Sequence, residues 1–124
     1  MHPIPHSRFV AVEPQSLPGH WECDLADDSL RWSPDVYDIF GMPRGAPLDR
    51  GAIVRMYAEE SRTMLDQLRA QAIAQRGSFT FEARIVRADG ASRWIRIAAD
   101  VVCRDGRATH LYGLKQDITA EIGG

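Results

Sequence analysis

Apolar and polar positions alternate in two short stretches near the start of the chain. Residues 19–25 place Trp21, Cys23 and Leu25 on one side and polar side chains on the other, which is the pattern of a half-buried strand. Residues 26–28 contain two aspartates and have the composition of a turn. Residues 29–32 read as a second short strand, so the pattern predicts a β-hairpin over residues 19–32.

The middle of the chain carries helix signals. Ser33 and Pro34 are typical of a helix start, because serine can cap free backbone N–H groups and proline fits the first turn. Gly41 is expected to end this helix, and a short helix is expected at 52–57 after a loop. The longest helix is predicted over residues 61–76 from an apolar arc formed by Met64, Leu65, Leu68 and Ala72. Its polar positions are Arg62, Asp66, Arg69 and Gln75.

The last third of the chain alternates throughout and predicts three strands. Residues 78–85 form the first, and residues 94–103 form the second, with Ile95, Ile97 and Cys103 on one face. Turns at 88–90 and 104–106 contain Asp-Gly pairs that tolerate a left-handed backbone. The last strand, over residues 111–118, has an ambiguous face, because Leu111 and Leu114 lie on opposite sides.

The order of elements predicts an α+β fold. One face of the sheet is apolar over at least three strands, and the helices lie between the strands in sequence, so the helices must cover that face. We therefore expect a five-stranded antiparallel sheet with short helices and one long helix covering one face. The sheet would form a cup, with a core or a cavity between its two layers.

Composition narrows the class of protein. The chain has 124 residues, enough for one domain, and residues 1–18, with four prolines, read as a lead-in segment. A net charge of -2 argues against nucleic acid as a partner, because a protein that binds phosphates needs clustered positive charge. Neither a membrane-spanning run nor a signal peptide is visible in the sequence. Two cysteines imply no disulfide framework, so we expect a cytoplasmic location without membrane insertion.

Five motifs in order resemble a PAS domain of the subtype common in bacterial sensor histidine kinases and diguanylate cyclases. They are Gly19–Leu25 as an opening strand, Trp32-Ser33 with the helix ending at Gly41, Phe81–Ile85, Asp89-Gly90 with Arg93-Trp94-Ile95, and Tyr112-Gly113 with Asp117-Ile118-Thr119. The resemblance covers residues 19–119. It departs from the family at residues 57–61, where Tyr-Ala-Glu-Glu-Ser stands in place of the usual His-Pro-Glu-Asp before the long helix.

The resemblance implies a sensory or regulatory module in bacterial signal transduction. Such a module relays ligand or partner binding to an attached or partner output protein. The signal-passing motif falls on Asp117, Ile118 and Thr119, and residues 120–124 would be a junction to an output domain. We expect no catalysis by the chain itself, because no nucleophile, metal or phosphate-binding motif stands out in the sequence.

The resemblance also raises the question of a cofactor. A haem version needs a histidine on the long helix, and residues 61–76 contain none. A blue-light flavin version carries a reactive cysteine at a helix start, whereas Cys23 and Cys103 fall in predicted strands and read as inert packing residues. The four histidines show no metal-ligand spacing. We expect neither haem, flavin nor metal, and an unknown small ligand stays open.

Two roles for the cup remain open. In the first, the domain senses a small molecule in a cavity. In the second, it is a protein-interaction or dimerisation module whose bulky side chains fill the cup, and the absence of a cofactor signature favours this role. The candidate cavity residues are Trp21, Cys23, Tyr37, Phe40, Met56, Leu68, Phe81 and Ile97.

The outer face of the sheet is a candidate interface. Trp94 and Val102 are predicted to point away from the core and to form an apolar patch that needs a cover. The lead-in segment could supply the cover within the chain, or a partner chain could. The interface hypothesis is a homodimer through the sheet and the segment 9–12, with Phe9, Val10, Trp94 and Val102 in contact.

Overall fold

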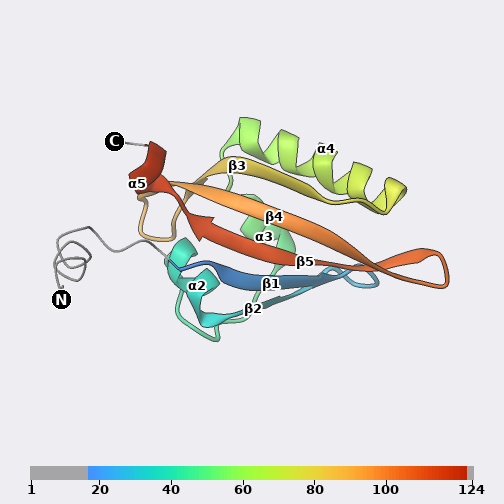
Figure 1. Ribbon diagram of the computed structural model, residues 1–124. Helices are drawn as coiled ribbons and strands as arrows, with labels where there is room; N and C mark the ends of the chain where they lie inside the picture. Colours follow the sequence, from blue (N-terminus) through green and yellow to red (C-terminus); the bar gives the residue numbers. More distant parts are fainter. Residues whose placement is uncertain (1–16, 123–124) are drawn as a thin grey trace, which may run out of the picture.

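A computed structural model describes residues 17–122 of the chain (Figure 1). Its strands form one five-stranded antiparallel sheet in the order β2-β1-β5-β4-β3. The expected α+β fold is therefore confirmed. The strands are β1 (Gly19–Asp24), β2 (Ser29–Trp32), β3 (Phe79–Val86), β4 (Ser92–Arg104) and β5 (Arg107–Asp117).

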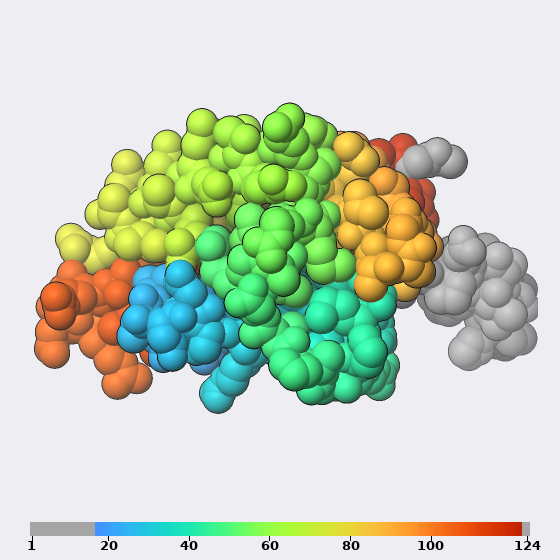
Figure 2. Space-filling view, turned by 180° about the vertical axis from the view of Figure 1, so that it is seen from behind, coloured from blue at the N-terminus to red at the C-terminus, as the bar shows by residue number. Residues whose placement is uncertain are grey.

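The helices between β2 and β3 cover one face of the sheet. They are α2 (Pro34–Phe40), α3 (Arg50–Val54) and α4 (Glu59–Gln75), and a last short helix, α5 (Thr119–Ile122), follows β5. The view from behind shows α3 and α4 covering this side of the molecule, with the β1–β2 hairpin beside them (Figure 2). The predicted cup is thus formed by the sheet and these helices.

Local hydrogen bonds explain the hairpin and the first helix. The Asp24 and Asp27 side chains accept from the backbone N–H groups of Ala26 and Ser29, at 2.9 and 3.0 Å, which closes the expected turn. Helix α2 begins at Pro34, but the Ser33 hydroxyl does not cap it. That oxygen instead accepts from the backbone N–H of His20 at 2.9 Å and ties the helix start to β1.

Helix α4 begins at Glu59, before the expected start, and its buried face is rotated from the predicted arc. Met64 is 44% exposed, and Leu68 is only half-buried, while Ser61 and Ala72 are buried. The reason is a contact with the sheet: the Ser61 hydroxyl accepts from the backbone N–H of Arg84 in β3 at 2.9 Å. This bond pins the first turn of α4 on β3 and decides which side of the helix is covered.

The β4–β5 hairpin is longer than the sequence pattern indicates. Strand β5 begins at Arg107, and the pairing register shifts between Val102 and Cys103. Cys103 is exposed, so its expected place on the core face is wrong. A bulge puts two residues opposite one and breaks the alternation of faces beyond it, which a sequence pattern of period two does not anticipate.

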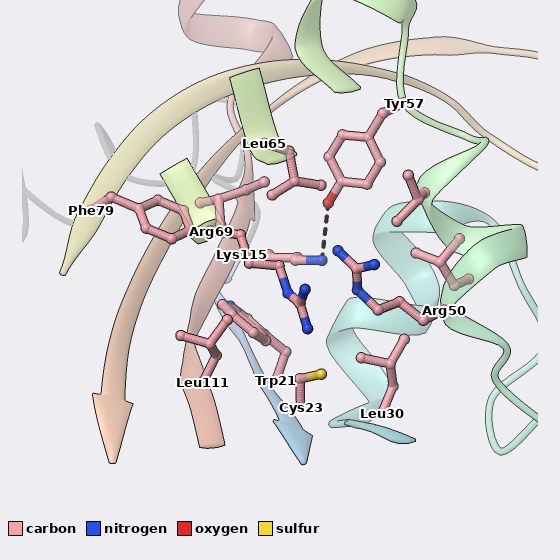
Figure 3. A pocket seen from close by; sticks show the side chains of 13 residues that line it. Trp21, Cys23, Leu30, Arg50, Tyr57, Leu65, Arg69, Phe79, Leu111 and Lys115 are labelled. Atoms are coloured by element: carbon pink, nitrogen blue, oxygen red, sulfur yellow. Dashed lines mark hydrogen bonds between the residues drawn. The ribbon is translucent and has the colours of Figure 1, made fainter. Parts of the chain in front are cut away.

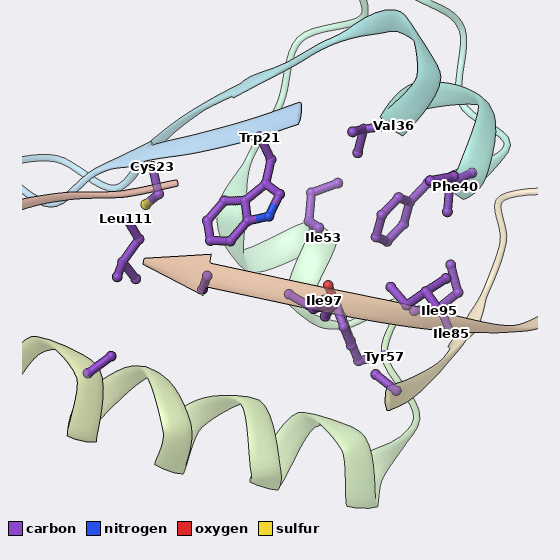
Figure 4. Packing of buried hydrophobic residues seen from close by; sticks show 14 residues of the cluster. Trp21, Cys23, Val36, Phe40, Ile53, Tyr57, Ile85, Ile95, Ile97 and Leu111 are labelled. Atoms are coloured by element: carbon purple, nitrogen blue, oxygen red, sulfur yellow. The ribbon is translucent and has the colours of Figure 1, made fainter. Parts of the chain in front are cut away.

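The core lies between the sheet and the helices (Figure 4). Ile85, Ile95 and Ile97 project from β3 and β4, and Val36 and Phe40 project from α2, all with 0–1% exposure. Strand β5 faces this core through Leu111, while Tyr112 and Leu114 are exposed on the other side. The ambiguous face of the last strand is thereby resolved.

Candidate functional site

A small cavity of about 50 Å³ lies between the sheet and helices α3 and α4 (Figure 3). Its walls are largely apolar and include Trp21, Leu30, Ile53, Leu65, Ile97 and Leu111. Five further side chains bring polar or titratable groups to it: Cys23, Arg50, Tyr57, Arg69 and Lys115. The cavity is therefore an apolar space with a concentrated set of cationic groups.

Lys115 lies on the inner face of β5, among the core residues. Its neighbours across the sheet are Gly19 in β1 and Ile97 in β4, and residues directly opposite each other in an antiparallel sheet share a face. Gly19 has no side chain, and Val36 of α2 packs where a Cβ of residue 19 would lie. The pairing register thus directs a lysine into the core, where lysines are rare.

The ammonium group of Lys115 is held by aromatic rings and one hydrogen bond. Its Nζ lies 5.3 and 5.6 Å from the ring centroids of Trp21 and Trp32, and 5.1 and 5.6 Å from those of Phe40 and Tyr57. Cation–π attraction operates within about 6 Å of a ring centroid. Nζ also donates to the Tyr57 hydroxyl at 3.0 Å.

Burial sets the protonation of both partners. Desolvation, together with the nearby positive charge of Arg50, lowers the pKa of Lys115 to about 7. Desolvation also raises the pKa of the Tyr57 hydroxyl well above its usual value, so the phenol stays neutral. Lys115 can therefore gain or lose a proton near neutral pH, which an exposed lysine does not do.

Tyr57 is positioned by the segment between α3 and α4. This segment runs beside β3, with backbone hydrogen bonds from Ala58 to Arg84 and from Val86 to Met56, at 2.9 and 2.8 Å. Tyr57 forms an isolated antiparallel bridge with Ile85. Because the segment is held on both sides of Tyr57, the hydroxyl is directed inward to Lys115.

Two arginines line the cavity from the helices. Arg50 is the first residue of α3, which Asp49 caps by accepting from Ala52 N–H at 2.9 Å. Arg69 lies in α4 and pairs with Asp28 of the β1–β2 turn at 2.7 Å. Figure 3 shows the ends of Lys115, Arg50 and Arg69 turned toward one space. The expectation that Arg69 belongs to the polar face of its helix is only partly right, because its side chain is 21% exposed.

The thiol of Cys23 lines the cavity. Burial raises its pKa, and the charge of Arg69 opposes that shift. A neutral thiol is a weak nucleophile, so the geometry supports the packing role expected for Cys23.

The predicted cavity residues separate into three groups in the structure. Trp21, Cys23 and Ile97 line the cavity. Tyr37 and Phe40 are buried in the core beside it. The remaining three are only partly buried and lie outside the lining: Met56, Leu68 and Phe81.

Sequence reasoning missed the cationic residues and Tyr57. One signal for Lys115 was available: it is four positions after Leu111, and strand residues at even separations share a face. Arg50 and Arg69 carried no such signal, because their approach to the cavity depends on how α3 and α4 lie on the sheet.

The junction residues at the end of β5 are anchored to β4. Thr119 Oγ1 accepts from the backbone N–H of Trp94 at 2.9 Å, and Asp117 accepts from the N–H of Thr119 at 2.9 Å. Arg93 Nε lies 4.0 Å from a carboxylate oxygen of Asp117, while Arg96 pairs with Glu82 and Glu121. The Thr119 hydroxyl is thus engaged by β4 at the start of α5. Ile118 is buried.

The candidate interface is only partly within the described residues. Trp94 and Val102 are half-buried on the outer face of the sheet, where Tyr112 and Leu114 are exposed. Phe9 and Val10 lie outside the described residues.

Metal sites and membrane-spanning helices are two further features that concern residues 17–122. No group of three or more histidine, cysteine, aspartate or glutamate side chains in that range is arranged to hold a metal ion. Within the same range, no helix combines the length and the apolar character that crossing a membrane requires.

A family model described as the PAS fold matches residues 29–114, which is more than half of the chain. The chain belongs to the PAS-fold family. The matched span of this PAS domain runs from β2 to Leu114 in β5 and includes all three helices over the sheet. A comparison with curated proteins gave no match.

Solved structures share the fold of this PAS domain. The N-terminal domain of a diguanylate cyclase with a PAS/PAC sensor from Marinobacter aquaeolei has a TM-score of 0.76 at 20% identity, covering 85% of this chain and 98% of that one. A sensory box histidine kinase/response regulator from Burkholderia thailandensis has a TM-score of 0.73 at 19% identity, with coverage of 84% and 79%. A domain of a putative light and redox sensing histidine kinase from Haloarcula marismortui has a TM-score of 0.72 at 19% identity, with coverage of 93% and 99%.

Proposed function

We propose that this PAS domain is a sensory module that binds a small ligand in the cavity and relays binding to an attached or partner output protein. The observation that carries the proposal is the burial of Lys115 in an apolar cavity. Burying a charged ammonium costs free energy, and a core filled only for stability would place an apolar residue there. Strongly perturbed titratable groups in a cavity are typical of functional sites.

The site is connected to the expected output junction by one strand. Lys115 and Asp117 are two residues apart in β5 and point to the same face, and Thr119 follows with its hydrogen bonds to Trp94. A ligand that displaces Lys115 would shift the end of β5 against β4. The proposed relay is a change in the angle at which α5 leaves the sheet. Two structural neighbours, a diguanylate cyclase from Marinobacter aquaeolei and a histidine kinase/response regulator from Burkholderia thailandensis, support a bacterial signalling context.

The proposal does not include a chromophore. Helix α4 contains no histidine, and Cys23 lies in a strand, so neither haem ligation nor a flavin–cysteine adduct has a suitable residue on the long helix or at a helix start. We therefore expect the purified domain to be colourless. A stoichiometric haem or flavin band in the absorbance spectrum would contradict this expectation.

The alternative is a protein-interaction or dimerisation module with a self-filled core. The size of the cavity favours it, because about 50 Å³ holds only a few waters at roughly 10–15 Å³ each. A ligand larger than that requires movement of the arginines at the helices.

Mass spectrometry of compounds released from the purified, unfolded domain tests the proposal. If the domain is a sensor, we expect the wild-type domain to retain a small molecule. The variant Ile97→Trp, whose larger side chain fills the cavity, should not retain it. Thermal denaturation of both proteins shows that the variant is folded. If no compound is released and no compound added from a metabolite panel raises the melting temperature, the domain is the interaction module.

A further inference from the structure

We propose that the ligand is a small organic carboxylate, bound with its anionic end between Lys115, Arg50 and Arg69. This inference rests on the proposed function and names the ligand class for the same cavity. Three cationic side chains from β5, α3 and α4 line one small space. A carboxylate is the anion whose two oxygens match a guanidinium fork, and a short apolar body suits the cavity walls.

The charges around the cavity are not balanced within the described part of the chain. None of the described lining residues is an aspartate or a glutamate. Arg69 has its partner at the surface, in Asp28, whose side chain is 48% exposed. Within residues 17–122, Arg50 forms no ion pair with a carboxylate, and its charge disfavours the charged form of Lys115. A bound anion would relieve this repulsion.

Further donors at the cavity lack acceptors. The indole Nε1 of Trp21 is buried and has no hydrogen-bond partner among the described residues. Trp21 lines the cavity and is 9% exposed. A buried donor without an acceptor costs free energy, and a carboxylate brings acceptor oxygens. The ammonium of Lys115 has three N–H donors, of which the Tyr57 hydroxyl accepts one.

The different burial of the polar side chains in the cavity suggests how the ligand is oriented. Lys115 and Tyr57 are buried, whereas Arg50 and Arg69 are half-buried, so the ammonium lies at the base and the guanidinium groups lie nearer the solvent. The apolar walls favour a short aliphatic carboxylate over phosphate, which is fully polar and has no apolar part. Arg50 and Arg69 would move outward to admit it and then close on the carboxylate.

The protonation of Lys115 should make the affinity for a carboxylate depend on pH. The titratable groups that line the cavity around Lys115 are Tyr57, Arg50, Arg69 and Cys23. The pKa of Lys115 itself is about 7. Anion binding favours the charged ammonium. Affinity is therefore expected to fall as pH rises above 7, by up to tenfold per pH unit.

Calorimetric titration of the purified chain with sodium propionate, butyrate and benzoate tests the inference. Propionamide, butyramide and benzamide are the uncharged controls. Sodium phosphate tests an inorganic anion and n-butylamine tests an organic cation, all at matched ionic strength. We expect saturable binding of at least one carboxylate, at least tenfold weaker binding of its amide, and weaker carboxylate binding at pH 8.5 than at pH 6.5. Phosphate binding as tight as carboxylate binding would overturn the choice of a carboxylate.

Three variants locate the bound anion. Lys115→Met and Arg50→Gln should each weaken carboxylate binding at least tenfold. Arg31→Gln, at an exposed arginine outside the cavity, should leave carboxylate binding unchanged.

Equal binding by wild type and both cavity variants would overturn the inference, as would equal binding of carboxylates and amides. If mass spectrometry finds a neutral or cationic ligand while the carboxylates fail, the inference is wrong and the sensory function stands. If no compound of any charge binds, both fail.

Discussion

The side-chain nitrogen of Lys115 donates a 3.0 Å hydrogen bond to the hydroxyl of Tyr57, and both groups are buried between the sheet and the helices. The bond joins β5, which leads to the end of the domain, to the segment between α3 and α4. A change in the cavity that alters this bond therefore acts on two layers of the fold at once.

The stability of the domain should rise with pH near neutrality. The folded-state pKa of Lys115, about 7, lies below its ordinary value of 10.5, so between these values the unfolded chain binds more protons, and raising the pH favours the folded state. From pH 6 to 8.5 we expect Lys115 to contribute an increase of about 2 kcal/mol in the free energy of unfolding. Urea denaturation at several pH values measures it.

Lys115→Met is the matched control for the pH effect. The variant removes the buried charge but keeps a long side chain, so it should be more stable than wild type at pH 6, and the difference should shrink as pH rises to 8.5. Parallel stability curves for the two proteins would show that Lys115 does not titrate in this range.

Tyr57→Phe should destabilise the domain more at pH 6 than at pH 8.5. The variant removes the hydroxyl that accepts from Lys115, and an ammonium left without a buried partner costs about 1–3 kcal/mol. Tyr37→Phe is the control, because the Tyr37 hydroxyl donates to the Ala46 carbonyl at 2.9 Å and no charge is involved. Its smaller cost should be the same at both pH values. The same cost at both pH values for Tyr57→Phe would contradict the expectation.

Gly113→Ala should be strongly destabilising. A Cβ at this position in β5 would overlap the carbonyl oxygen of Ala98 in β4, and overpacking of this kind costs about 1–3 kcal/mol. Gly77→Ala is the control, because a Cβ there meets no atom within 4 Å. Urea midpoints of the two variants measure the difference, and equal midpoints would refute the close approach of β4 and β5.

The junction at the end of β5 should transmit the signal. Thr119→Val leaves the Trp94 N–H without its acceptor, which we expect to cost about 1–3 kcal/mol.

In a fusion of the domain to a histidine kinase, Asp117→Ala should abolish the response to ligand while the domain stays folded. Asp66→Ala, on α4, is the control for a lost surface charge. An unchanged response of Asp117→Ala would rule out this junction.

Self-association should occur through the outer face of the sheet. Trp94 lies on the face where Tyr112 and Leu114 are exposed, and truncating a tryptophan at an interface centre typically costs about 2 kcal/mol or more. Sedimentation velocity should therefore show a dimer that Trp94→Ala weakens. Met64→Ala, at an exposed residue of α4, should have no effect. A wild-type monomer at high micromolar concentration would exclude the homodimer.

The sequence by itself determined the elements and their order. The alternation around Trp21 predicts β1. The Ser33-Pro34 pair and Gly41 mark the start and the end of α2. The alternation in the last third of the chain predicts the three-stranded meander. These signals are local: each depends on residues a few positions apart, and the same local forces act in the folded chain. The fold class followed, because helices between two sets of strands must cover the apolar face of one sheet.

Only the tertiary structure decided which residues form the site. Lys115 is polar and reads as a surface residue, yet the pairing of β5 between Gly19 and Ile97 places it in the core. Arg69 reaches the cavity because the contact between Ser61 and Arg84 sets how α4 lies on the sheet, and the same contact leaves Met64 exposed. Strand register and helix rotation are set by contacts between residues distant in sequence. A local pattern does not contain them.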